Sequence, residues 1–103
     1  MPTLKGILKD VKKELIQKAS VRETAQQNMR KTTSLSKQSI LLLHQKKYKK
    51  ARKTIETAKE IISKLQASEK ETPEIIHSGM FNAALQEYAE ANIFQTLIQE
   101  ARF

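Results

Sequence analysis

The sequence contains no cysteine, no tryptophan, and only two glycines and two prolines. The absence of cysteine excludes disulfides and thiolate metal sites. The scarcity of glycine and proline argues against a loop-rich or all-β chain, because turns depend on those residues. Long apolar runs are missing too: the longest aliphatic run, ILLL at 40–43, is far too short to cross a bilayer. The N-terminal residues lack the continuous apolar segment of a secretory signal, so we expect a soluble, cytoplasmic protein.

The chain has 103 residues, of which 39% are hydrophobic and 29% are charged. This length suits a single small domain that spans residues 1–103. The hydrophobic share is below that of an average globular domain, and the charged share is slightly above it. We therefore expect a thin core, completed by contacts with other helices or other subunits.

The net charge of +8 is unevenly distributed along the chain. Residues 1–53 carry 15 Lys/Arg and 3 Asp/Glu, whereas residues 54–103 carry 4 Lys/Arg and 8 Asp/Glu. A basic half on a soluble chain favours a polyanionic partner such as nucleic acid. Charge that serves solubility alone is the alternative.

The first half of the chain predicts one long helix over about residues 3–45, because apolar residues recur there at alternating spacings of four and three. The stripe consists of Leu4, Leu8, Val11, Leu15, Ala25, Met29, Ser36, Ile40 and Leu43, and it is interrupted by Lys18, Arg22 and Thr32 or Thr33. A helix of this length would reach about 60 Å. That length exceeds the needs of one small domain and favours packing shared with partners.

Two further helices are predicted after a short break around residues 45–47. One spans about residues 48–66, with a stripe formed by Tyr48, Ala51, Ile55, Ala58, Ile62 and Leu65. The other spans about residues 73–101, with Thr72 as its N-cap, Pro73 in its first turn and a kink near Ser78-Gly79. Its core face comprises Phe81, Leu85, Tyr88, Ala91, Phe94 or Gln95, and Ile98. The predicted fold class is therefore all-α, with about three long antiparallel helices.

The segment KKYKKARK, residues 46–53, places six cations within eight residues. Such a cluster could follow a phosphate backbone and release its counterions, or it could be a solvated helix face. Tyr48 could stack on a base, but it also starts the apolar stripe of the second helix. Arg22 interrupts the stripe of the first helix, where it must either pair locally, with Glu14 or Glu23, or face a channel.

Two histidines and two glutamates are the other candidate functional residues. His44 lies near the predicted end of the first helix, where it would stabilise free carbonyl groups. His77 has no second histidine at a metal-binding spacing, so a zinc motif is not supported. Glu87 and Glu90 share one helix face and have no cation at helical spacing, so their mutual repulsion favours a bound cation. An exposed helix face is the alternative for this pair.

Two segments resemble the translin and translin-associated factor X family. They are MRKTTSLSKQSILLLHQ at 29–45, which contains Arg30 and Lys37, and FNAALQEYAEANIFQTLI at 81–98. The specific part of the resemblance is LQEYAEA at 85–91, and VRETA at 21–25 is similar to an Arg-Glu pair in the family's first helix. The resemblance covers the N-terminal half of the family's domain. Lys31 departs from the pattern, since the family often has an acid there.

The resemblance implies a translin-like helical bundle that assembles into hollow homo- or hetero-oligomers around single-stranded RNA or DNA. It also implies a magnesium-dependent endoribonuclease subunit, in which Glu87 and Glu90 would be catalytic acids and Mg²⁺ ligands. A third acid lies in a later helix of the family, which a partner would have to supply here. The candidate nucleic-acid-binding residues are Arg22, Arg30, Lys31, Lys37, Lys46, Lys47, Lys49, Lys50, Arg52 and Lys53.

The residues leave three functional interpretations open. The first is a nucleic-acid-binding subunit with a hydrolytic site, in which metal ions activate water and stabilise the developing charge. The second is a binding or structural subunit of the same fold without turnover. The third is a coiled-coil adaptor whose charge serves solubility alone.

Overall fold

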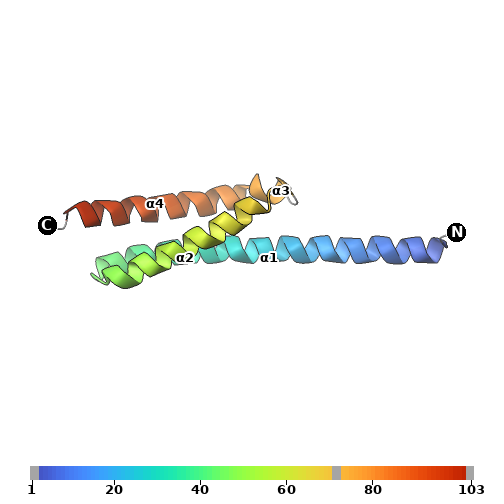
Figure 1. Ribbon diagram of the computed structural model, residues 1–103, viewed down its shortest axis with the longest axis horizontal. Helices are drawn as coiled ribbons and strands as arrows, with labels where there is room; N and C mark the ends of the chain where they lie inside the picture. Colours follow the sequence, from blue (N-terminus) through green and yellow to red (C-terminus); the bar gives the residue numbers. More distant parts are fainter. Residues whose placement is uncertain (1–2, 71–72, 102–103) are drawn as a thin grey trace.

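The computed structural model describes residues 3–70 and 73–101 and shows an all-α protein, without a strand in those two ranges (Figure 1). Its helices are α1 (Leu4–His44), α2 (Tyr48–Ala67), α3 (Pro73–Ile76) and α4 (Gly79–Ala101). α2 folds back along the C-terminal half of α1, and α4 then runs in the same direction as α1. The predicted all-α fold of long helices is thus confirmed.

The first two helices agree with the prediction to within one residue at each end, but the third is divided in two. α3 begins at Pro73 as expected, whereas Thr72 lies outside the described residues. The division falls at His77–Ser78, beside the predicted kink. The Ser78 hydroxyl forms a hydrogen bond on each side of this division. It donates to the Ile75 carbonyl at 2.6 Å and accepts from the Phe81 N–H at 3.2 Å. The second bond satisfies a free donor of the first turn of α4.

The bundle is held together by three stripes of buried residues that follow the spacing of a coiled coil. The buried positions are Ala25, Met29, Thr32, Ser36, Ser39 and Leu43 on α1, then Ala51, Ile55, Ala58, Ile62 and Leu65 on α2, and Phe81, Ala84, Ala91 and Gln95 on α4. Steps of three and four alternate along α1 and α2, as in a heptad repeat. The stripe predicted for α2 is confirmed except at Tyr48, which is half-buried.

Small side chains at the centre of these stripes allow the helices to approach closely. Thr32 and Ser36 are fully buried, and each hydroxyl donates to the carbonyl four residues earlier, at 2.9 and 2.8 Å. The hydroxyl of Ser39 reaches the backbone carbonyl of Ala51 on α2 at 3.4 Å. A serine can span from one helix to the backbone of another only where the two are tightly packed. The buried hydroxyls therefore have partners and carry no desolvation penalty.

Larger side chains fill the core at the end of the bundle near α3. There, Met29, Leu65 and Phe81 pack in one cluster with Ile75 and Ile76 of α3. The two isoleucines bury the short α3 helix, although the sequence pattern did not mark them as core residues. On α4, Leu85, Tyr88 and Ile98 are half-buried rather than fully buried.

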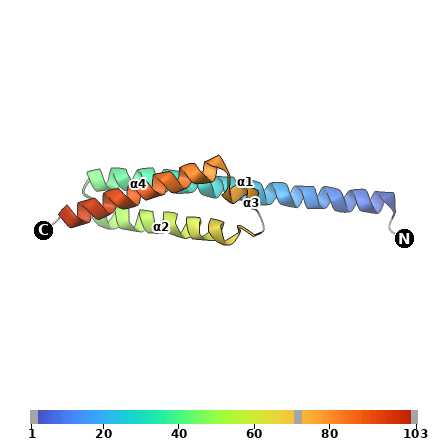
Figure 2. The same cartoon turned by 90° about the horizontal axis from the view of Figure 1, so that it is seen from above.

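The N-terminal half of α1 extends beyond the bundle as a single helix (Figures 1 and 2). The molecule therefore measures 74 × 19 × 17 Å. The stripe predicted for α1 is buried only from Ala25 onward: Leu4, Leu8, Val11 and Leu15 are 47–73% exposed. The described part of the chain leaves these four residues of the predicted stripe uncovered, because α2, α3 and α4 do not reach that far. Among the described residues, no helix is long and apolar enough to span a membrane.

The close packing predicts that Ala84→Leu destabilises the bundle strongly. Ala84 is fully buried between helices, so a larger side chain forces the helices apart, at a cost of about 1–3 kcal/mol or more. Ala89→Leu, on the exposed side of the same helix, should change the free energy of unfolding by less than about 0.5 kcal/mol. Urea denaturation followed by circular dichroism measures both, and equal effects would contradict the packing.

Candidate nucleic-acid interface and acidic pair

The acidic pair lies on a helix that carries no basic residue. α4 contains Glu87, Glu90 and Glu100 but neither lysine nor arginine. Glu87 is half-buried and Glu90 is exposed, and neither forms an ion pair with another described residue. Within the described ranges, no three His, Cys, Asp or Glu side chains gather closely enough to hold a metal ion. The described part of the chain thus presents two carboxylates on one face, without a third acid gathered beside them.

A groove between α1 and α4 brings two of the candidate cations to the side of α4 that carries the acidic pair. A hollow of about 390 Å³ is lined by Met29, Arg30, Thr33, Ser34 and Lys37 of α1 and by Met80 and Ala83 of α4. Further along the same two helices, the His44 and Phe94 rings meet with centroids 5.2 Å apart. Glu87 follows Ala83 by one turn and precedes Phe94 by two. The acidic pair therefore lies on the side of α4 that Ala83 and Phe94 turn toward α1, and Arg30 and Lys37 line the hollow at Ala83.

The corner between α1 and α2 gathers most of the other cations. A tight turn forms there because Lys46 N–H donates to the Leu43 carbonyl at 3.0 Å and Lys47 N–H to the Leu42 carbonyl at 2.9 Å. This is the hydrogen-bond pattern of a Schellman motif. Lys46 has a φ of 63°, a left-handed conformation that glycine usually occupies at this position. The turn ends α1 and starts α2 within three residues, 45–47.

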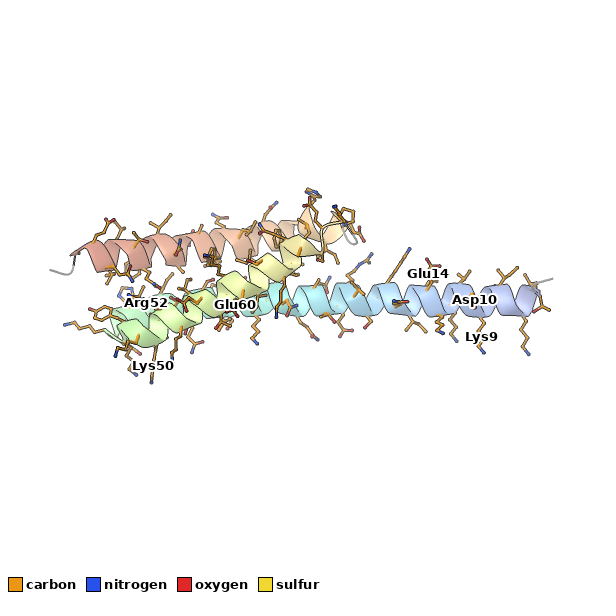
Figure 3. All side chains as sticks on the ribbon, viewed as in Figure 1. Lys9, Asp10, Glu14, Lys50, Arg52 and Glu60 are labelled. Atoms are coloured by element: carbon orange, nitrogen blue, oxygen red, sulfur yellow. The ribbon has the colours of Figure 1, made fainter. Side chains whose placement is uncertain are left out.

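All six cations of residues 46–53 are exposed at this corner, which we call the basic corner. None of them forms an ion pair with a residue that the structure describes. A surface hollow of about 560 Å³ is lined by Lys46, Lys47, Tyr48, Lys49, Lys50 and Arg52. Figure 3 labels Lys50 and Arg52, which come from the first turns of α2 at the end of the bundle remote from the N-terminus. The corner therefore concentrates positive charge that is not held in ion pairs among the described residues.

The two remaining candidate cations lie apart from these groups. Arg22 is exposed at the far end of the bundle, where it lines a hollow of about 530 Å³ between α1 and α3. Neither of its predicted partners binds it: Glu14 pairs instead with Lys18 at 3.8 Å. Lys31 is also exposed, but it lies about 100° around the helix from Arg30. The candidate residues thus form separate groups along the molecule rather than one patch.

A polar groove between α2 and α4 was not predicted from the sequence. It has a volume of about 370 Å³ and is lined by Arg52, Ile55, Glu56, Lys59, Tyr88, Asn92, Gln95 and Gln99. Gln95 occupies a core position of α4, and its buried Oε1 has no hydrogen-bond partner among the described residues. An amide at a core position of a heptad was the available sequence signal, since such residues commonly fix the register of a coiled coil. Arg52 belongs both to this groove and to the basic corner.

Burial raises the pKa of the Tyr88 hydroxyl above its usual value of 10.0. A raised pKa in the folded state means that folding favours the protonated phenol. This contribution to stability is present below pH 10 and is lost as the pH rises through the pKa of the folded state. We therefore expect Tyr88 to ionise above the normal tyrosine range. Ultraviolet titration of the wild type against Tyr88→Phe isolates its curve, and a midpoint at or below 10 would contradict the burial.

Comparisons with protein-family models, with curated proteins and with solved structures found no match for this chain. The resemblance to the translin family therefore depends on the quoted residues, above all on the motif at 85–91. The structure shows the basic corner, the α1–α4 groove and the acidic pair independently of that resemblance.

Proposed function

We propose that this protein binds single-stranded nucleic acid, with the basic corner as the principal contact. The observation that carries the proposal is the set of six exposed cations at residues 46–53, which have no ion-pair partner within the described ranges. Each lysine or arginine that neutralises a phosphate releases condensed counterions, so a dense cluster binds a polyanion with high affinity at low salt. An adaptor with charge for solubility alone has no need to concentrate its cations in this way.

Two grooves offer paths for the rest of the strand, and one of them begins at the basic corner. Arg52 connects the corner to the α2–α4 groove. The amide side chains of that groove could donate hydrogen bonds to bases and accept hydrogen bonds from them. On the other side of α4, Arg30 and Lys37 line a hollow with Ala83, which lies one turn before Glu87 on α4. A flexible single strand can follow such separated cations more readily than a stiff duplex can, and this favours the single-stranded form.

Magnesium-dependent cleavage of the bound strand is the second candidate function. Glu87 and Glu90 are one turn apart on a helix without cations, so a divalent ion would relieve their repulsion. Mg²⁺ is commonly held by one or two carboxylates, with water and substrate phosphate as its other ligands, and these two residues fit that donor set. When bound, the ion would supply an activated water. Arg30 and Lys37 would hold the phosphates of the strand beside the acids.

The family resemblance extends this proposal to an oligomer in which a partner supplies the third acid. Two carboxylates from one chain are a partial site, and helices from another subunit would complete it. In a subunit that only binds, the same cations would act and the acidic pair would have no role. Cleavage and binding therefore need separate tests.

We expect binding to depend on the basic corner and to weaken steeply with salt. Lys47→Gln with Lys50→Gln removes two phosphate contacts, so the slope of log K against log salt should decrease by about 1.4. The affinity for a labelled 20-nucleotide oligouridylate should decrease about tenfold at low salt. Fluorescence anisotropy measures both quantities.

The matched control is Lys64→Gln with Lys70→Gln, which makes the same change in net charge at exposed residues near the other end of α2. We expect this variant to bind almost as tightly as the wild type. Equal losses in the two double variants would mean that net charge, rather than the basic corner, determines affinity. No measurable binding at low salt would overturn the proposed function itself.

The cleavage proposal predicts a magnesium-dependent loss of full-length single-stranded RNA. The double variant Glu87→Gln, Glu90→Gln should abolish cleavage, because the neutral amides cannot neutralise the metal charge. It should retain the anisotropy signal of binding, since the basic corner is unchanged. Glu100→Gln on the same helix is the control and should leave cleavage intact. Cleavage that survives in the double variant would exclude these two residues as the site.

A further inference from the structure

The N-terminal arm of α1, residues 4–22, carries an apolar stripe that no other described residue covers. Its exposed apolar side chains are Leu4 (73%), Ile7 (45%), Leu8 (59%), Val11 (47%), Leu15 (62%), Ile16 (61%) and Val21 (42%). Leu4, Leu8, Val11 and Leu15 continue the four-three spacing of the buried positions on α1. The arm is therefore built as one strand of a coiled coil.

We propose that two copies of this chain form a dimer in which their arms pair antiparallel. This inference does not depend on the proposed nucleic-acid function. The spacing of the stripe selects one register: Leu4 of one copy lies opposite Leu15 of the other, and Leu8 lies opposite Val11. In this register all four residues face an apolar partner across a two-fold axis, as an isologous interface requires.

The shape of the molecule favours the same arrangement. A straight helix drifts by only about 20° per heptad, so the stripe of the arm faces broadly the same side of α1 as the bundle. α3 and the start of α4 close off this side where the arm ends, and they leave a step (Figure 1). A parallel partner helix would run into α3. An antiparallel arm instead fits the step and is itself long enough to fill it.

The pattern of charge along the arm marks where the pairing must stop. Lys18 and Arg22 occupy the next stripe positions after Leu15, so an apolar partner fits only over residues 4–15. A register shifted by one heptad would place Leu4 opposite Arg22 and Leu8 opposite Lys18. That shift would bury two cations against leucine and is therefore excluded.

The hollow at the closed end of the step lies beside the N-terminal end of the partner's arm. It measures about 530 Å³ and is lined by Glu14, Gln17, Lys18, Val21 and Arg22 of α1 and by Glu74 and Ile75 of α3. Figure 3 shows Glu14 on the side of α1 that faces α3, with Lys9 on the opposite side. A helix N-terminus carries partial positive charge, which Glu14 and Glu74 favour and Lys18 and Arg22 oppose. In the register above, Leu4 of one copy lies opposite Leu15 of the other, so the arm begins beside this hollow.

Repulsion between lysines opposes pairing in this register and gives the dimer a characteristic salt dependence. Lys5 of one arm and Lys12 of the other lie on the same flank of the seam, where antiparallel helices bring like positions together. Added salt screens this repulsion. The dimer should therefore become no weaker, and somewhat stronger, as salt is raised. Nucleic-acid binding has the opposite salt dependence, so the two interactions can be told apart.

Sedimentation equilibrium over a series of protein concentrations tests the dimer. The paired surface is small, so we expect a dissociation constant on the order of 10 μM. Leu8→Glu should weaken the dimer at least tenfold, and circular dichroism should show the bundle still folded, since Leu8 lies outside the core. Leu41→Glu is the control, because Leu41 is also exposed (57%) on α1 but lies away from the arm. A monomer at every concentration, or a dimer insensitive to Leu8→Glu, would overturn the proposal.

Disulfide trapping tests the register. The natural chain has no cysteine, so any disulfide that forms must join the introduced cysteines. The double variant Leu4→Cys, Leu15→Cys should give a covalent dimer under mild oxidation, because these positions face each other only between copies. Within one chain they are about 16 Å apart along the helix. Each single variant should give much less dimer. Equal trapping in single and double variants would contradict the antiparallel register.

Discussion

The packing of α1 against its neighbours is the constraint on which the other features of the molecule depend. α2 and α4 both pack against α1 more extensively than they pack against each other. The contact is close because threonine, serine and alanine occupy the centre of the seam, with the Ser39 hydroxyl bonded to the backbone of α2. This geometry fixes the direction of α2 at the turn after His44. It consequently determines where the basic corner lies and which side of α4 borders α1.

Acidic and basic residues lie on different helices, and the packing keeps the two groups apart. α4 has only acidic charged residues, and the start of α2 has only basic ones. The two groups lie on the same bundle but on different faces, so the carboxylates of α4 are not consumed by ion pairs with the lysines. A protein stabilised by surface ion pairs would show the reverse arrangement. The separation leaves both groups able to interact with a ligand, and this is the physical basis for proposing that they do.

The fold could be predicted well because helix periodicity is a local property. Alternation of three and four residues identified the buried positions from Ala51 to Leu65 on α2, where one helix face meets a continuous core. The same rule failed for Leu4 to Leu15, since periodicity shows that a stripe exists but not whether another helix covers it. Ile75 and Ile76 were missed for the opposite reason. Their helix is one turn long, which is too short for a period to be visible.

The candidate site was harder to predict because it depends on which residues meet across helices. Spacing placed Glu87 and Glu90 on one face of α4, but it could not show that Arg30 and Lys37 line a hollow with Met80 and Ala83 of the same helix. It also could not show that Arg22 lies at the far end of the bundle from the 46–53 cations, beside α3. The α2–α4 groove was missed because Tyr88 was assigned to the core and Gln95 was only an alternative to Phe94. The groove exists because Tyr88 and Gln95 lie beside residues of α2, and the spacing within α4 does not reveal those neighbours.

The two proposals become linked if the arms pair as the register requires. Lys5, Lys9 and Lys12 lie on one flank of each arm, so the dimer would bring both sets together along one side. Their mutual repulsion weakens the dimer, and a bound polyanion would remove that repulsion. A ligand that binds one state more tightly must shift the equilibrium toward that state. Nucleic acid bound along this side would therefore promote dimerisation, and the dimer would in turn bind nucleic acid more tightly than the monomer does.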